Sequence, residues 1–330
     1  MKAIHYPIVL VCLLFLVIAG CNTSDENKSI DLGEVTRSVF YAPQYVALEK
    51  GFFEDEGLDV SLQTTWGGDK TMTALLSESV DVALVGSETS IYVYAQDSKD
   101  YAVNFAQLTQ TDGTFLVSKE EEPDFEWNDV EGNTFLGQRK GGMPQMVGEY
   151  VLKDHGIDPH TDLNLEQNIE FENIPGAFVS GDAKYVQLFE PTASVFEKEG
   201  KGNVVASFGE ESGKLPYTVF MAKQSMVDDD PDTIKKFTKA IYEAQQWVDD
   251  NSPEDIAKVI QPYFEDADLD ILTDSMERYK NQSSFATDPI LEEDEWNHLK
   301  DIMDEADELP EDISYDDLVN TDIAKEVMEK

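Results

Sequence analysis

The sequence predicts an α/β protein with two lobes, and three observations support that fold class. From Ile30 onward, short apolar strands alternate with amphipathic helices, a pattern that favours parallel sheets with right-handed crossovers. An acidic loop at residues 120–124 contains a proline and interrupts this series between two strands. The chain has 330 residues, and roughly 300 of them follow the N-terminal apolar segment, enough for two lobes of ordinary size.

The first lobe is predicted to begin with two strand–helix units. Pro43 suits the first turn of a helix, and Gly51 suits its C-terminal cap. The expected elements are strand 32–40, helix 43–50, strand 58–62, helix 70–77, strand 80–85 and a helix that begins near Ser87. A strand at residues 114–119 is expected to leave this lobe.

The second lobe is predicted from the strand–helix series that follows the acidic loop. Its expected elements are strand 134–137, helix 144–155, strand 164–171, helix 175–180, strand 184–189 and helix 191–199. A strand at residues 217–223 then returns to the first lobe, and the remainder is expected to be helical, with starts at Asp230-Pro231, Ser252-Pro253 and Ser314.

These elements predict that the chain crosses between the lobes twice, near Lys119 and Tyr217. Two crossovers are typical of a receptor that closes on its ligand by a hinge. The predicted division is a signal segment at 1–20, a tether at 21–29, lobe 1 at 30–118 and 218–330, and lobe 2 at 119–217.

The first residues predict secretion and lipid anchoring. Lys2 precedes an apolar run from Ile8 to Ala19, which is too short to span a bilayer and ends in small residues before Cys21. This arrangement is typical of a bacterial lipoprotein signal, in which Cys21 becomes the lipidated first residue of the mature chain. Two acyl chains on that cysteine would hold the protein on the outer face of the cell membrane. The alternative is an ordinary secretory signal in which Cys21 has no role.

Composition excludes several classes of function. The formal charge of −44 arises from 68 acidic against 24 basic residues and would repel a phosphate backbone, so nucleic-acid binding is excluded. The sequence has two cysteines, of which Cys12 would leave with the signal and Cys21 would be lipidated. No thiol then remains for a disulfide, a metal site or a nucleophile. We expect no cofactor and no metal.

Three stretches of the chain resemble a known family of transport proteins. They are YAPQYVALEKGFFEDEGLDV at residues 41–60, LLSESVDVALVG at residues 75–86 and VEGNT at residues 130–134. All three are similar to the periplasmic-type substrate-binding proteins of the nitrate, sulfonate, taurine and thiamine-precursor group. The resemblance implies a type II periplasmic-binding-protein fold, with a small molecule bound in a cleft between two α/β lobes. It also implies an ABC importer as partner, with a permease and an ATPase, and we expect the chain itself to be a monomer.

Ligands of open α/β sheets bind where strands end and helices begin. Four such places occur, at residues 40–43, 86–89, 137–144 and 189–192. The third has two cations, Arg139 and Lys140, and two glycines just before a helix, where free backbone N–H groups and the helix dipole favour an anion. It resembles the place where the family holds an oxyanion, but Met143 and Pro144 replace the hydroxyl residue that is usual there.

Aromatic rings and carboxylates flank the same loops. Rings beside the carboxylates Glu88, Asp112 and Glu190 would suit a planar heterocycle with an amino group, for example a pyrimidine. Tyr41 and Glu190, each directly before a helix that starts with proline, are favoured for the pocket. Tyr45 is expected in a helix core instead, and Trp66 against the surface of a lobe. The candidate ligand-binding residues are Tyr41, Gln44, Ser87, Glu88, Asp112, Arg139, Gly141, Gly142, Met143, Gln145, Phe178, Glu190 and Tyr217.

The ligand class stays open between an anion and an amino-bearing ring. Arginine suits bidentate binding of carboxylate, sulfonate or phosphate, and the chain has only Arg37, Arg139 and Arg278. Each arginine could instead pair with one of the many surrounding carboxylates. We expect such a pair for Arg37, whereas Arg139 is balanced between the two roles.

Two other classes of function compete with solute binding. Pyrimidine synthases of eukaryotic thiamine biosynthesis share the implied fold and use a histidine, but His155, His160 and His298 fall outside the predicted cleft loops. The sequence has no zinc-site spacing, no Ser-His-Asp arrangement and no P-loop. We therefore expect a binding protein and not an enzyme. A purely adhesive surface lipoprotein would lack a cleft with convergent polar groups.

Overall fold

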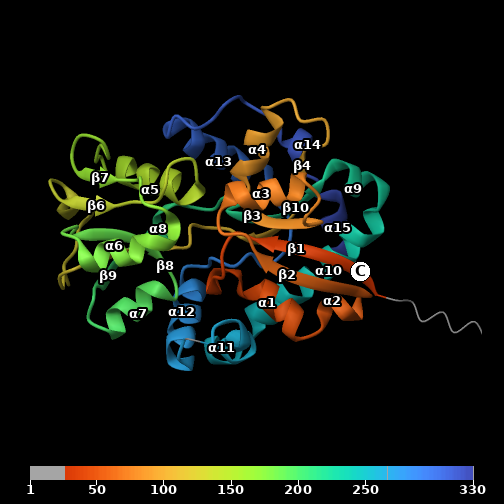
Figure 1. The fold of residues 1–330 in the computed structure, drawn as a ribbon, viewed down its shortest axis with the longest axis horizontal. Helices are drawn as coiled ribbons and strands as arrows, with labels where there is room; N and C mark the ends of the chain where they lie inside the picture. Colours follow the sequence, from red (N-terminus) through yellow and green to blue (C-terminus); the bar gives the residue numbers. More distant parts are fainter. Residues whose placement is uncertain (1–26, 266, 330) are drawn as a thin grey trace, which may run out of the picture.

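The protein consists of two α/β lobes, as the sequence predicts, and each lobe is built on a five-stranded sheet (Figure 1). The structure is a computed structural model that describes residues 27–265 and 267–329. The predicted signal segment at 1–20 and the lipidation site at Cys21 lie outside these residues. In Figure 1 the two sheets lie next to each other along the long axis of the molecule.

The sheet of lobe 1 combines strands from distant parts of the chain. Its strands are β1 (Lys28–Glu34), β2 (Leu58–Thr64), β3 (Val82–Gly86), β4 (Ala102–Thr109) and β10 (Thr218–Lys223), in the order β2-β1-β3-β10-β4. β1 runs parallel to β2 and β3, whereas β10 runs antiparallel between β3 and β4. All of β4 is buried, as expected for a strand that is covered on both faces.

The sheet of lobe 2 is drawn from one continuous stretch of chain. Its strands are β5 (Thr114–Ser118), β6 (Thr134–Leu136), β7 (Asn164–Glu166), β8 (Tyr185–Phe189) and β9 (Asn203–Ser207), in the order β7-β6-β8-β5-β9. β6 runs parallel to β7 and β8, whereas β5 runs antiparallel to β8 and β9. The two sheets therefore share one pattern, three parallel strands followed by an antiparallel one.

Helices connect the strands and form most of the chain after β10. Lobe 1 contains α1 (Ala42–Glu49), α2 (Phe52–Asp55), α3 (Gly68–Leu76) and α4 (Glu88–Tyr94), and lobe 2 contains α5 (Met143–Asp154), α6 (Ile174–Ser180), α7 (Thr192–Lys198) and α8 (Phe208–Glu211). The C-terminal helices are α9 (Gln224–Asp229), α10 (Pro231–Asp250), α11 (Pro253–Ile260), α12 (Leu269–Asn281), α13 (Glu293–Glu305), α14 (Tyr315–Leu318) and α15 (Asp322–Met328). Short 3-10 helices span Val39–Tyr41, Trp127–Val130, Phe171–Asn173 and Gln261–Tyr263.

The longest helix, α10, illustrates why these segments are helical. Ile234, Phe237, Ile241, Ala244 and Val248 recur at three- and four-residue spacing and are all buried, which gives the helix one apolar face toward the core. Asp230 precedes the helix, and its side chain accepts a hydrogen bond from the Thr233 backbone N–H. That cap satisfies one of the free N–H groups in the first turn.

The two crossovers do not both lie where the sequence predicts. The strand that was expected to leave lobe 1 is β5, and its ladders with β8 and β9 place it in the second sheet. The first crossover therefore precedes Thr114, and the predicted boundary between residues 118 and 119 is wrong. The second crossover lies between β9 and β10, near Tyr217 as predicted.

Several predicted element boundaries also differ from the structure. The first strand spans Lys28–Glu34 and not residues 32–40, because the Ser38 side chain accepts a hydrogen bond from the Phe40 backbone N–H and caps a 3-10 helix there. Lys28 and Ser29, predicted as part of the tether, thus belong to a strand. β7 is shorter than predicted, and the strands β4 and β9 were not predicted.

The C-terminal helices contact both lobes, whereas the sequence assigned them to lobe 1. α12 packs against α7 of lobe 2 and against the 3-10 helix Val39–Tyr41 of lobe 1, and α13 packs against α5. Lys153 of α5 also donates a hydrogen bond to the backbone carbonyl of Glu305 at the end of α13. Within residues 27–265 and 267–329, no helix is both long and apolar enough to span a membrane.

Candidate functional site

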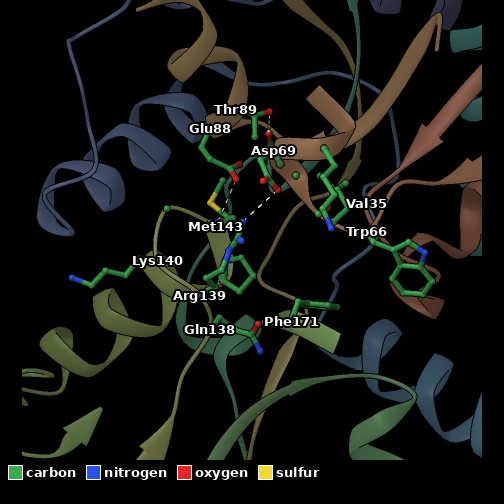
Figure 2. A pocket seen from close by; sticks show the side chains of 18 of the residues that line it. Val35, Trp66, Asp69, Glu88, Thr89, Gln138, Arg139, Lys140, Met143 and Phe171 are labelled. Atoms are coloured by element: carbon green, nitrogen blue, oxygen red, sulfur yellow. Dashed lines mark hydrogen bonds and ion pairs between the residues drawn. The ribbon is translucent and has the colours of Figure 1, made fainter. Parts of the chain in front are cut away.

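A cavity of about 220 Å³ lies between the two lobes, at the carboxyl ends of parallel strands. Lobe 1 contributes the segments after β1, β2 and β3, and lobe 2 contributes the loop between β6 and α5. Figure 2 shows side chains of both lobes around this space. The lining includes Tyr41, Trp66, Asp69, Glu88, Thr89, Tyr92, Gln138, Arg139, Gly141, Gly142, Met143, Glu170, Phe171, Tyr217 and Thr218.

Glu88 connects the two lobes at the centre of this cavity. It is the first residue of α4, and only 4% of its surface is exposed. Its Oε1 accepts a hydrogen bond from the Met143 backbone N–H of lobe 2 at 3.3 Å (Figure 2). Its Oε2 has no hydrogen-bond partner within the described part of the chain. Burial raises the pKa of Glu88 to about 7, although the backbone N–H groups of Glu88 and Met143 lower it in part.

The conformation of Glu88 depends on the glycine that ends β3. A Cβ atom at Gly86 would collide with the Glu88 carboxylate, so glycine leaves the space in which the carboxylate folds back. One turn further along α4, the Tyr92 hydroxyl lies 3.7 Å from Met146 Sδ of α5. The first helix after β3 and the first helix of lobe 2 therefore face each other across the cleft.

The loop predicted to hold an anion has protein partners of its own. The Gly141 backbone N–H donates to Gln145 Oε1 at 3.0 Å, and Gln145 Nε2 in turn donates to Glu149 Oε1 at 2.7 Å. Arg139 pairs with Asp69 of lobe 1 at 3.3 Å and with Glu170 of lobe 2 at 3.4 Å. The prediction left Arg139 balanced between ligand and carboxylate, and the structure gives it two carboxylates.

Two solvent-exposed aromatic rings line the cavity from opposite lobes. Trp66 follows β2 and is 51% exposed, and Phe171 lies in lobe 2 and is 37% exposed. Exposed rings of this size cost free energy in water unless something covers them. The prediction that Trp66 packs against a lobe surface is wrong, because its side chain is more than half exposed at the cleft.

Tyr41 and Tyr217 are buried rings of the same lining. The Tyr217 hydroxyl has no partner of full hydrogen-bond geometry among the described residues, but the Asp112 carboxylate lies close to it. Burial raises the pKa of Tyr217, and the nearby Asp112 carboxylate raises it further. Asp112 itself is buried outside the lining, where burial raises its pKa to about 6 and a 2.6 Å hydrogen bond from the Thr114 backbone N–H opposes that rise.

Glu190 lies on a smaller neighbouring hollow of about 110 Å³ that shares Gln138 and Phe171 with the main cavity. It follows β8, is buried, and both of its carboxylate oxygens have partners. Oε1 accepts hydrogen bonds from Arg278 Nη1 at 2.7 Å and from Ser194 Oγ at 2.9 Å. Oε2 accepts one from the Ser194 backbone N–H at 2.9 Å. The structure therefore gives Glu190 an ion pair, where the sequence predicted a ligand.

The prediction for Arg37 and Tyr45 is confirmed. Arg37 Nε lies 3.0 Å from Glu34 Oε1, and the buried Tyr45 hydroxyl donates to Glu34 Oε2 at 2.7 Å. Gln44, a candidate ligand-binding residue, donates to the same oxygen at 2.9 Å. These side chains form a polar cluster next to the cleft, and Gln44 does not line the main cavity.

The structure does not bring Ser87 and Phe178 to the cavity. Ser87 donates a hydrogen bond from Oγ to the backbone carbonyl of Pro216, which ties the start of α4 to the second crossover. Phe178 is buried within lobe 2, where its ring centroid lies 6.0 Å from that of Phe196. Ser87 was expected at the cleft because a predicted helix begins near it, and Phe178 because it was taken to flank a cleft loop.

Several lining residues were missed by the sequence analysis. The side chains of Asp69 and Tyr92 come from α3 and α4, and Phe171 comes from a segment that was predicted as strand. Helical periodicity could have identified Tyr92, because it lies four residues after Glu88 and therefore on the same face of α4. No group of three or more His, Cys, Asp or Glu side chains that could hold a metal ion occurs in the part of the chain that the structure describes.

Comparison with solved structures identifies the fold. In solved structures, the chain matches the alkanesulfonate-binding protein SsuA from Xanthomonas axonopodis pv. citri (TM-score 0.71, 13% identity, covering 90% of this chain and 99% of that one). It also matches the periplasmic nitrate-binding protein NrtA from Synechocystis PCC 6803 (TM-score 0.69, 18% identity, covering 92% and 89%). The fold is that of the periplasmic binding proteins.

The family follows from the sequence. The model of the NMT1-like family matches residues 23–262, and the chain belongs to this family. The putative binding protein YtlA of Bacillus subtilis (strain 168) is 60% identical over 314 residues, which cover 95% of this chain and 94% of that protein. The resemblance stated from residues 41–60, 75–86 and 130–134 is confirmed. An enzyme, the desulfurization enzyme DszB, also has this fold (TM-score 0.64, 11% identity, covering 92% and 99%).

Proposed function

We propose that this chain is the extracytoplasmic solute-binding lipoprotein of an ABC importer and that its ligand is a planar ring with an amino or cationic group. The observation that carries the ligand class is the lining of the main cavity. Exposed rings, Trp66 and Phe171, accompany an unpartnered carboxylate oxygen of Glu88. Rings stack on planar ligands, and a carboxylate accepts hydrogen bonds from amino groups.

The charges of the cavity favour this ligand over nitrate or a sulfonate. Arg139, which the sequence left balanced between an anionic ligand and a carboxylate partner, is paired with Asp69 and Glu170. A bound anion would also lie close to the carboxylate of Glu88. Like charges at such distances repel, and the repulsion grows in a partly buried site.

The ligand class can be tested by titration calorimetry on the purified protein with a panel of small molecules. We expect 4-aminopyrimidine derivatives to bind and nitrate and methanesulfonate to bind at least about a hundred-fold more weakly, a difference of about 2.7 kcal/mol. Tight binding of either oxyanion with no binding of amino-bearing rings would overturn the proposed ligand class.

Anchoring by lipid is proposed from the signal-like residues 1–20 and from Cys21. Replacing Cys21 with serine should release the protein into the medium, because the thioether that carries two acyl chains cannot form. Cys12→Ser is the matched control, since Cys12 lies inside the segment that would be removed. Membrane retention of the Cys21→Ser protein, without an acyl label in wild type, would contradict the anchor.

We propose binding and not catalysis, although an enzyme shares the fold. The histidine positions support this choice: His155 stacks on Trp127 with ring centroids 5.1 Å apart, and His298 Nε2 lies 2.8 Å from the backbone carbonyl of Ser212. Neither lines the main cavity. Recovery of an unchanged ligand after prolonged incubation, checked by mass spectrometry, is the expected result, and ligand turnover by the purified protein would refute it.

A further inference from the structure

The N-terminus of α5 points at a carboxylate of the opposite lobe. α5 has 12 residues and begins at Met143, and the free N–H groups and dipole of its first turn favour a negative charge. The charge found there is that of Glu88, whose Oε1 lies 3.3 Å from the Met143 backbone nitrogen. The protein thus supplies its own anion at the place where the sequence predicted a bound one.

A second observation indicates that Glu88 also serves a ligand. Its Oε2 is buried and has no hydrogen-bond partner within residues 27–265 and 267–329. An ionised carboxylate accepts hydrogen bonds at both oxygens, and leaving one buried oxygen unpaired is costly. Glu88 lines the main cavity, and its Oε2 is folded back against Gly86. A ligand N–H group in the cavity therefore reaches this oxygen when the carboxylate turns toward the cavity.

We propose that Glu88 is the specificity-determining residue of the cleft: it occupies the anion position at the N-terminus of α5, excludes oxyanions from it, and presents its second oxygen to an N–H group of the ligand. This inference rests on the proposed function and names the residue that sets the ligand class. In Figure 2 the Glu88 carboxylate lies between α4 and the start of α5, on the same side of the cavity as Asp69.

The surroundings of Glu88 fit this role. Arg139 of the lining pairs with Asp69 and Glu170, and Glu88 forms no ion pair with any residue that the structure describes. Glu190, the other buried carboxylate at the end of a strand, is neutralised by Arg278 at 2.7 Å. A positively charged or amino-bearing ligand would give the Glu88 carboxylate a hydrogen-bond donor, as Arg278 does for the Glu190 carboxylate.

The test is a change of specificity in the full-length chain, purified in detergent. Glu88→Ser removes the internal anion and leaves a hydroxyl beside the free N–H groups of α5. We expect it to bind methanesulfonate or nitrate at least about ten-fold more tightly than wild type does, and 4-aminopyrimidine at least about ten-fold more weakly. No gain of oxyanion binding in a folded Glu88→Ser protein would overturn the inference.

Two further variants keep the test decisive. Glu88→Gln keeps an oxygen for the Met143 N–H but removes the charge. We expect it to bind aminopyrimidine more weakly than wild type and to bind oxyanions no more tightly. Oxyanion binding as tight as that of Glu88→Ser would overturn the inference. Glu172→Ser, at an exposed position outside the cavity lining, also replaces a carboxylate with a hydroxyl but lies away from the cavity. It should change the affinity for neither the aminopyrimidine nor the oxyanions.

The outcome also separates this inference from the proposed ligand class. If Glu88→Ser gains oxyanion binding while wild type binds no amino-bearing ring, Glu88 excludes anions as inferred and the ligand class is wrong. If wild type binds the ring and Glu88→Ser binds it equally well, the ligand class stands and the inference about Glu88 fails.

Discussion

The two lobes place a buried carboxylate at matching points of matching sheets and surround it differently. β3 and β8 are each the third strand in their sheets. Glu190 directly follows β8, and Glu88 lies two residues after the end of β3. Glu190 is paired with Arg278 and with both the N–H and the hydroxyl of Ser194. Glu88 has one long hydrogen bond and one unpartnered oxygen within the described residues.

This difference indicates which carboxylate is structural and which is available. A buried carboxylate with an arginine partner and satisfied oxygens stabilises the fold only as a pair, and it has no oxygen left for a ligand. A buried carboxylate without a cation keeps a raised pKa and an affinity for any donor that enters. The sequence alone could not tell the two apart, because Arg278 lies far from Glu190 along the chain.

The largest effect is expected from removing the cation on the Glu190 side. Arg278→Ala should lower the free energy of unfolding by roughly 3–5 kcal/mol, because it leaves the buried Glu190 charge without its partner. Urea unfolding measures this loss. Arg139→Ala is the matched control, because its exposed pairs contribute less than about 1 kcal/mol. A loss below about 1 kcal/mol for Arg278→Ala would mean that the two carboxylates do not differ as described.

On the Glu88 side, the expected effect depends on pH. The pKa of Glu88 is raised from 4.5 to about 7 in the folded state, so the folded protein holds this proton more tightly than the unfolded chain does. The stability that this proton contributes is complete below pH 4.5 and is lost as the pH rises through about 7.

Glu88→Gln stays neutral at every pH and therefore avoids that loss. The free energy of unfolding of Glu88→Gln, measured with urea, should exceed that of wild type by near zero at about pH 4 and by roughly 3 kcal/mol at about pH 8. The measurement at low pH serves as the internal control. An advantage that does not change between these pH values would show that Glu88 is not the buried, unpaired acid described above.

The exposed rings can show which hollow receives the ligand. Trp66 lines only the larger cavity, whereas Phe171 lines both hollows. Trp66→Ala and Phe171→Ala should each weaken binding of an aromatic ligand by about 1 kcal/mol. Val179, 47% exposed and outside both linings, is the matched control. If only Phe171→Ala weakens binding, the ring of the ligand lies in the smaller hollow next to Glu190.

The smallest effect is expected from the ion pair that joins the lobes at the rim of the cavity. Asp69 and Arg139 are largely exposed, and their atoms lie 3.3 Å apart. Asp69→Asn should change the free energy of unfolding by less than about 1 kcal/mol, and the change should shrink in high salt. A larger effect that persists in high salt would mean that this rim, and not Glu88, holds the lobes together.

Local patterns in the sequence predicted most of the fold, and long-range pairing set the rest. The helix start at Pro231 and the strand at residues 114–118 could be found because caps and apolar runs act over a few residues. The sequence could not show to which sheet residues 114–118 belong, because that depends on their pairing with β8 and β9. β4 was missed because burial on both faces removes the alternation by which a strand is recognised.

The same limit applies to the candidate site. Tyr41, Glu88 and Met143 were found because each follows a strand or begins a helix. Phe178 was expected at the cleft because it was taken to flank a cleft loop, yet it packs inside lobe 2. The face of a helix that turns to the core depends on its tertiary neighbours. Trp66 was assigned to a lobe surface, although it is exposed at the cleft. Nothing in the neighbouring sequence distinguishes an exposed ring at a cleft from a ring that packs against the protein.

The late position of β10 in the chain has a consequence for how the protein is made. β10 lies between β3 and β4, so the sheet of lobe 1 cannot close until residues 218–223 have been synthesised. All strands of lobe 2 lie within residues 114–207 and can pair before then. We expect lobe 2 to fold first during synthesis and export, while lobe 1 keeps the apolar edge of β3 unpaired and depends on distant contacts that form slowly.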